Sequence, residues 1–141
     1  MSKVVGKLVF DIGNFEKNVE VNNSNVKISI VGIIYATGTL NKIGNITGTL
    51  DINNSKGYSY VNGNYSYYLP QGNICSLVLG DYPASFSESQ EPKYNFVTPI
   101  INGTGDFLNC IGDTILIPKK NANSNDSVII TFYDKPNYPL V

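Results

Sequence analysis

Apolar and polar residues alternate along most of this chain, and this pattern constrains its fold more than any other feature. The segment from Val26 to Ile30 has an apolar residue at every second position, and the segment from Ile43 to Ile52 largely follows the same rule. A period of two is typical of a β-strand with one buried face, whereas an amphipathic helix repeats every 3.6 residues. No long stretch carries a helical apolar stripe. The alternation therefore predicts an all-β protein.

Turn-forming residues divide the alternating pattern into short strands. Asn62-Gly63-Asn64 lies between two tyrosine-rich runs and predicts a hairpin, because the favoured two-residue turn needs positive φ angles. Gly32 interrupts an apolar run and predicts a bulge or a tight bend. The nine strand candidates are residues 5–12, 26–35, 43–52, 58–61, 65–69, 74–79, 94–101, 113–117 and 128–133.

The number and spacing of these candidates favour one antiparallel β-barrel of about eight strands, with a β-sandwich as the alternative. We expect residues 1–141 to form this single domain. Residues 85–92 and 119–126 are predicted to be polar loops. Residues 134–141 contain two prolines and predict an extended tail that packs on the barrel or on a neighbouring subunit.

The composition excludes several classes of function. The chain has ten lysines, no arginine, no histidine and no tryptophan, and its net charge is −1. Without histidine, neither a Ser-His-Asp nor a Cys-His catalytic set can form within the chain. The lysines are scattered and do not form the basic stripe of a nucleic-acid-binding protein. We therefore expect no nucleic-acid partner, no metal site, no cofactor and no catalytic residue.

Two further features bear on where the protein acts. Cys75 and Cys110 both lie in apolar runs, which favours two buried thiols over a disulfide scaffold. The start of the sequence has no apolar signal core, and no run approaches the roughly 18 apolar residues of a membrane span. We expect an intracellular or virion-associated protein without a membrane partner. The abundance of Asn, Ile, Lys and Tyr suggests an AT-rich genome, such as that of a protist or of a large virus that infects one.

The segment from Pro99 to Pro118 carries a specific pattern. Two glycines bracket Thr104 and allow φ angles that bulky residues avoid, so that Phe107 can turn into the core. This segment resembles the signature of dirigent proteins and allene oxide cyclase-like barrels, approximately Gly-Gly-Thr-Gly-x-Phe-x-x-Ala-x-Gly. Asn102 stands for the first glycine, since Asn tolerates positive φ, and Cys110 stands for the alanine. The matching residues are Gly103, Thr104, Gly105, Phe107 and Gly112.

The resemblance implies an eight-stranded antiparallel barrel, often trimeric, that binds an apolar ligand. The pockets of plant dirigent proteins rely on charged residues that include arginine, which this chain lacks. The resemblance therefore supports the fold, but it assigns no catalytic residue in this chain.

Three hypotheses on function follow. The first is a non-catalytic barrel that acts through homo-oligomeric assembly or through binding. A trimer is the favoured oligomer, and the barrel could be a structural component of a larger particle such as a virion. The second is a dirigent- or cyclase-like barrel that orients an apolar small molecule. The third is a carbohydrate-binding module with surface tyrosines. Tyrosine can provide packing, subunit contacts or a ligand surface, and the candidate ligand contacts are Tyr35, Tyr65 and Tyr67.

Overall fold

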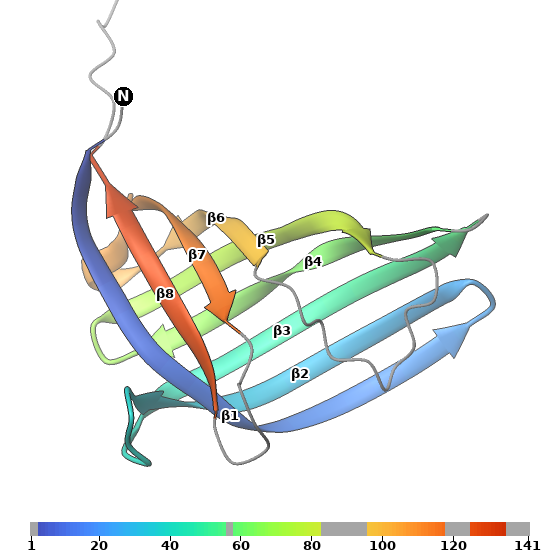
Figure 1. Cartoon of the computed structure of the whole chain (residues 1–141), viewed down its shortest axis with the longest axis horizontal. Helices are drawn as coiled ribbons and strands as arrows, with labels where there is room; N and C mark the ends of the chain where they lie inside the picture. Colours follow the sequence, from blue (N-terminus) through green and yellow to red (C-terminus); the bar gives the residue numbers. More distant parts are fainter. Residues whose placement is uncertain (1–2, 56–57, 83–95, 118–124, 135–141) are drawn as a thin grey trace, which may run out of the picture.

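Eight antiparallel strands form a closed barrel in the computed structural model, which describes residues 3–55, 58–82, 96–117 and 125–134 (Figure 1). Each strand pairs with the next along the chain, and the last strand closes the barrel on the first. The strands are β1 (Val4–Asn22), β2 (Asn25–Ala36), β3 (Lys42–Ser55), β4 (Tyr58–Leu69), β5 (Gly72–Tyr82), β6 (Phe96–Gly103), β7 (Ile111–Ile117) and β8 (Asp126–Tyr133). This architecture confirms the prediction of an all-β, eight-stranded barrel.

The strands differ in length, and this divides the core into two parts. Strands β1 to β5 have 11 to 19 residues, whereas β6 to β8 have only 7 or 8. The long strands therefore extend beyond the short ones on one side (Figure 1). Cluster 1 consists of Phe10, Ile12, Ile34, Ile46, Tyr67, Ile74, Phe107, Val128 and Ile130. Cluster 2 lies only on long strands and consists of Ile28, Leu50, Ile52, Val61 and Val78.

Strand β1 contains a bulge opposite Gly32. Gly13 pairs with Ile33 and Glu16 with Val31, so two residues of β1 oppose the single Gly32 of β2. A Cβ atom on Gly32 would lie 2.7 Å from the ring of Phe15, so glycine makes room for that ring. The irregularity predicted at Gly32 is thus present, and the extra residue belongs to the partner strand.

The hairpin predicted at Asn62-Gly63-Asn64 is wrong. These residues lie inside β4, which runs without interruption from Tyr58 to Leu69, so nine candidates become eight strands. Gly63 pairs with Leu50, and a Cβ atom there would lie 2.0 Å from the carbonyl oxygen of Thr49. Glycine at this position therefore permits the close approach of β3. Positive φ angles occur instead at the β1–β2 turn, in Asn23, and at the β4–β5 turn, in Gly72.

Several predicted segments lie outside the described residues, namely the loop at 85–92, most of the loop at 119–126 and the tail after Asp134. Asp126 begins β8 rather than ending a loop. At the start of the predicted tail, the backbone amide of Asp134 donates to the carbonyl of Lys3 over 2.9 Å. The extent of the domain, residues 1–141, stays a prediction. In the described ranges, no helix has the length and apolar character needed to cross a membrane.

Candidate functional site

The signature segment lies against the turn between β4 and β5. Gly105 to Phe107 form a single turn of 3₁₀-helix, η1, and Gly105 has a φ of 61°. The amide of Thr104 donates to the carbonyl of Asn73 over 2.9 Å, and the amide of Asn73 donates back to Thr104 Oγ1 over 3.0 Å. The amide of Asp106 donates to the carbonyl of Gln71 over 2.9 Å. These bonds attach the signature to the β4–β5 turn.

Phe107 lies in the core, as the pattern predicted. Its side chain is 8% exposed and stacks on Phe132, with ring centroids 5.8 Å apart. Gly112 allows a close approach of β8, because a Cβ atom there would lie 2.1 Å from the carbonyl oxygen of Thr131. The signature therefore has a structural role: it turns an aromatic ring inward and packs the short strands together.

Three details of the predicted signature need correction. Asn102 and Gly103 lie in β6 without positive φ angles, so only Gly105 uses the left-handed region. Gly103 is required for space, because a Cβ atom would lie 2.1 Å from the carbonyl oxygen of Phe107. Cys110 and Cys75 are free thiols of intermediate exposure rather than fully buried ones. Cys110 packs against cluster 1, and this partial burial raises the pKa of its thiol.

Three hydroxyl groups meet inside the otherwise apolar barrel. Ser76 of β5, Thr98 of β6 and Thr114 of β7 are 0%, 8% and 2% exposed. Thr114 Oγ1 lies 3.1 Å from Ser76 Oγ and 3.2 Å from the carbonyl oxygen of Thr98, and it also contacts the hydroxyl of Thr98. These are the buried polar residues of the described chain, and none of them carries a charge.

One of the predicted tyrosines, Tyr65, lies beside this hydroxyl cluster, and Tyr67 lies two residues further along β4. Tyr65 pairs across the sheet with Ser76, and it contacts both core clusters. Its ring covers Gly48, where a Cβ atom would lie 2.5 Å from Tyr65 Cδ1. Tyr67 is 2% exposed and packs edge-on against Phe10 at a centroid distance of 5.5 Å. Burial, and then the neighbouring Tyr65 and Cys75, raise the pKa of Tyr67 well above its usual value.

The third predicted tyrosine lies apart from the other two. Tyr35 follows Ile34, which belongs to cluster 1, and pairs with Asp11 of β1. It therefore belongs to the opposite alternation phase of β2. Its ring is only 5% exposed, and its hydroxyl accepts a hydrogen bond from the side-chain amide of Asn14 in the β1 bulge. Ligand contact by Tyr35, Tyr65 and Tyr67 stays a prediction.

The hydroxyl cluster was not predicted, although the sequence contains a signal for it. Ser76 lies between Ile74 and Val78 in the inward phase of β5, where the alternating pattern calls for apolar residues. A polar residue in an inward position is more informative than an exposed one, because its burial carries a cost in free energy.

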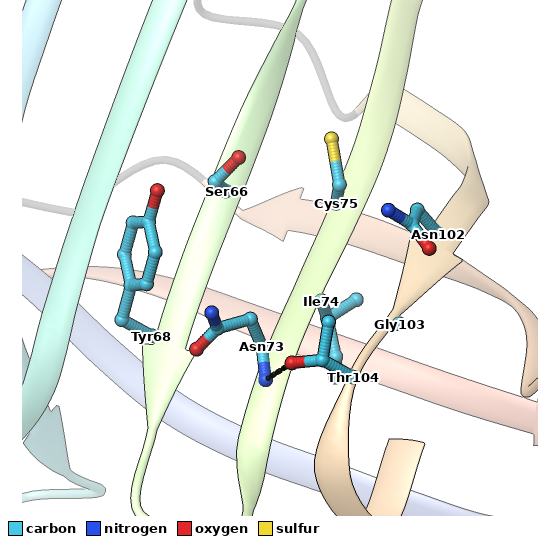
Figure 2. A pocket seen from close by; sticks show the side chains of 8 residues that line it. All are labelled: Ser66, Tyr68, Asn73, Ile74, Cys75, Asn102, Gly103 and Thr104. Atoms are coloured by element: carbon cyan, nitrogen blue, oxygen red, sulfur yellow. Dashed lines mark hydrogen bonds between the residues drawn. The ribbon is translucent and has the colours of Figure 1, made fainter. Parts of the chain in front are cut away.

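A hollow lies on the outer surface of the barrel, across β4, β5 and β6 (Figure 2). Its volume is about 220 Å³, and it is open to solvent. The residues that line it are Ser66, Tyr68, Asn73, Ile74, Cys75, Asn102, Gly103 and Thr104. We refer to it as the outer groove. Most of its side chains are polar, and all are uncharged.

A closed antiparallel barrel of eight consecutive strands, with an apolar interior and an inward-turned aromatic ring in the β6–β7 connection, defines a dirigent/cyclase-like barrel fold. Comparison with solved structures supports this class. The chain is similar to pyocyanin demethylase, with a TM-score of 0.66 and 15% identity over 90% of this chain and 99% of that one.

Two further structures have the same fold. A nonspecific heme-binding cyclase that catalyses a cycloaddition in neoabyssomicin biosynthesis has a TM-score of 0.63 and 14% identity, over 96% of this chain and 68% of that one. The pterocarpan synthase dirigent protein has a TM-score of 0.57 and 10% identity, over 94% and 87%. At these identities the likeness concerns the fold alone. No protein-family model and no curated protein sequence matches the chain.

Proposed function

We propose that this barrel binds a small apolar molecule with one polar group, and that the polar group is held near Ser76, Thr98 and Thr114. The observation that carries this proposal is the hydroxyl cluster itself. Hydroxyl groups are tolerated in an apolar core when they bond to one another, as these three residues do, so the interior contains one polar position among apolar side chains. Such a cluster would give an apolar ligand a defined orientation, because it places hydrogen-bonding groups from three adjacent strands together.

The position of Tyr65 supports the same proposal. It pairs with Ser76 and packs against both core clusters, so its ring lies on the inward face of β4. Tyr67, two residues along the same strand, adds a second ring on this face. A planar apolar ligand in this region would contact aromatic rings on one side and hydroxyl groups on the other.

The neighbours in fold are consistent with ligand binding. They are named for demethylation, cycloaddition and pterocarpan synthesis, each concerning small organic molecules. The buried hydroxyl groups of this chain are neutral, so they can hold and orient a ligand, but they are weak acids and bases at neutral pH. We therefore favour binding and orientation over acid–base catalysis. Any acceleration of a reaction would come from confinement of the reactants.

Native mass spectrometry of protein purified without denaturant tests the proposal. We expect a small-molecule adduct that is shed on denaturation and is lost or reduced at least fivefold in Thr114→Val, which keeps the side-chain shape but removes the hydroxyl. Thr131→Val is the matched control, because Thr131 is on β8 in the outward phase, opposite Lys7 and Asp113. An adduct that is equally retained in both variants, or no adduct after incubation with an apolar ligand library, would overturn the proposal.

A second candidate function is homo-oligomeric assembly, with a trimer favoured, as expected of a component of a larger particle. One specific observation favours it: apolar side chains are exposed on the outer face of adjoining strands β7, β8 and β1. Val5 is 57%, Val9 49% and Ile111 39% exposed, and Val9 continues across the sheet into Ile129 and Ile115. Exposed apolar rows of this kind are common in subunit interfaces.

Light scattering coupled to size-exclusion chromatography tests the assembly candidate. If this face is an interface, Val9→Lys reduces the oligomer mass, and so does truncation of the chain from Asp134. Val31→Lys serves as a control, because Val31 is equally exposed, at 52%, but lies on β2. A monomeric wild-type protein, or an oligomer mass unaffected by Val9→Lys and by the truncation, would count against assembly.

A further inference from the structure

The outer groove consists of two rows of side chains that cross three strands. Ser66 of β4, Cys75 of β5 and Asn102 of β6 are direct neighbours in the strand register and form the first row. Tyr68 and Asn73 pair in the same way and form the second row, which Thr104 completes after the end of β6. Figure 2 shows these side chains around a common space.

A bulge in β6 explains why Asn102 faces outward. Cys75 pairs with Asn102 and Ser76 pairs with Ile100, so Ile101 has no partner on β5. The extra residue reverses the alternation of β6, which places Asn102 beside the outward-facing Cys75. Without the bulge, the amide of Asn102 would point into the apolar barrel.

The polar groups of the outer groove are available to a ligand. Thr104 Oγ1 accepts from the backbone amide of Asn73 at 3.0 Å, and this bond fixes the end of the second row (Figure 2). Among the described residues, the side chains of Ser66, Asn73 and Asn102 have no hydrogen bond with another part of the chain. Tyr68 is 41% exposed, so part of its ring is free to be covered.

The chemistry of these groups identifies the class of ligand. Carboxamides can donate and accept hydrogen bonds at once, which suits hydroxyl groups that also do both. A tyrosine ring offers an apolar surface against which the C–H face of a sugar can pack. An anion would require lysine or arginine, a hard cation would require carboxylates, and a wholly apolar ligand would bury the two amides without partners.

The size of the groove limits the ligand further. Its volume of about 220 Å³ is below the roughly 300–1,000 Å³ of pockets that enclose a drug-sized molecule. We propose that the outer groove binds one neutral sugar residue, with its C–H face on Tyr68 and its hydroxyl groups on the amides of Asn73 and Asn102. This site is separate from the barrel interior and does not depend on the function proposed above.

Protein-observed NMR with a panel of neutral sugars tests this site. The panel consists of glucose, galactose, mannose, N-acetylglucosamine and their short oligomers. We expect a saturable shift of the side-chain amide signals of Asn73 and Asn102 with at least one sugar. Tyr68→Ala should raise the Kd at least tenfold, and Tyr68→Phe, which keeps the ring, should change it less than threefold. Tyr60→Ala is the matched control, since Tyr60 is on the same face of β4 and 44% exposed but does not line the groove.

Cys75 provides a second measurement in the unmodified protein. It lies in the first row, whereas Cys110 lies outside the groove, so the bound sugar should slow alkylation of Cys75 and leave that of Cys110 unchanged. The spectrum of each variant shows whether it is folded. The proposal is wrong if no sugar of the panel gives a saturable shift or protects Cys75, or if folded Tyr68→Ala binds as tightly as the wild type. Thr114→Val should leave sugar binding intact, which separates this site from the interior one.

Discussion

Replacement of Gly105 by alanine should strongly destabilise the barrel, and Gly38 offers a matched comparison. Both glycines have left-handed backbone angles, with φ of 61° and 71°. A Cβ atom on Gly38 would meet nothing within 4 Å, whereas one on Gly105 would lie 2.5 Å from the carbonyl oxygen of Gln71. The pair therefore separates the cost of the backbone angle from the cost of the close contact.

The expected loss in the free energy of unfolding follows from the backbone angle and from the hydrogen bonds around that contact. A left-handed residue with a Cβ atom costs about 1 kcal/mol, and this cost applies to both variants. At Gly105 the contact must open by about 0.9 Å to reach the 3.4 Å at which ordinary van der Waals contact begins. The same carbonyl of Gln71 accepts from Asp106 over 2.9 Å, and two further hydrogen bonds join Thr104 to Asn73.

Loss of these three hydrogen bonds costs about 1 kcal/mol each. We therefore expect the free energy of unfolding to fall by about 4 kcal/mol in Gly105→Ala and by about 1 kcal/mol in Gly38→Ala. For a chain of this size the melting temperature should fall by about 15 °C and about 4 °C. The smaller backbone entropy of the unfolded alanine variants offsets part of each loss equally, so the difference of about 3 kcal/mol remains.

Chemical denaturation followed by circular dichroism measures both variants, and equal m-values show that the same cooperative unit unfolds. An equal loss of stability in the two variants would refute the reasoning, because it would mean that the contact with Gln71 has no energetic effect. A loss below 1 kcal/mol in Gly105→Ala would do the same, since it would mean that the signature is not attached to the β4–β5 turn.

Two further substitutions test the interior. Burial raises the pKa of Tyr67 above the usual value of about 10, so the folded chain retains a proton that the unfolded chain releases at alkaline pH. The stability that the neutral Tyr67 contributes is therefore complete below pH 10, and it falls above that pH by up to about 1.4 kcal/mol per pH unit. Tyr67→Phe should reduce this fall in urea titrations, and a slope equal to that of the wild type would contradict the assignment. Phe107→Ala should cost about 3–5 kcal/mol, because it empties the space beside Phe132; a melting temperature within 2 °C of the wild type would show that this ring contributes little to the core.

The strands could be predicted from the sequence because most of them bury one face only. In β2, for example, Ile28 and Ile34 are buried while Val31 is half exposed, and this produces the visible period of two. The inward position of Phe107 was also predictable, because the glycines before it allow the backbone to turn sharply and direct the large apolar ring into the core.

Other features depended on contacts that no local pattern contains. Gly63 resembles a turn residue in the sequence, but its role comes from Thr49 and Leu50 on another strand. The local pattern did predict an irregularity at Gly32, but not that the extra residue lies on β1, where the ring of Phe15 covers Gly32. Such positions have the composition of turns because glycine serves both needs, a left-handed angle and a close approach.

The bulge at Ile101 connects the two candidate sites. On its N-terminal side, Thr98 and Ile100 face the interior, and Ile100 pairs with Ser76. On its C-terminal side the alternation is reversed, so that Asn102 faces the outer groove and Gly103 faces inward. In a β6 without the bulge, Thr98 and Asn102 would face the same side of the sheet. Either the hydroxyl of Thr98 would then point outward, or the amide of Asn102 would point into the core. One inserted residue therefore lets a short strand contribute a polar group to each face of the barrel, and bulges are enriched beside functional sites for this reason.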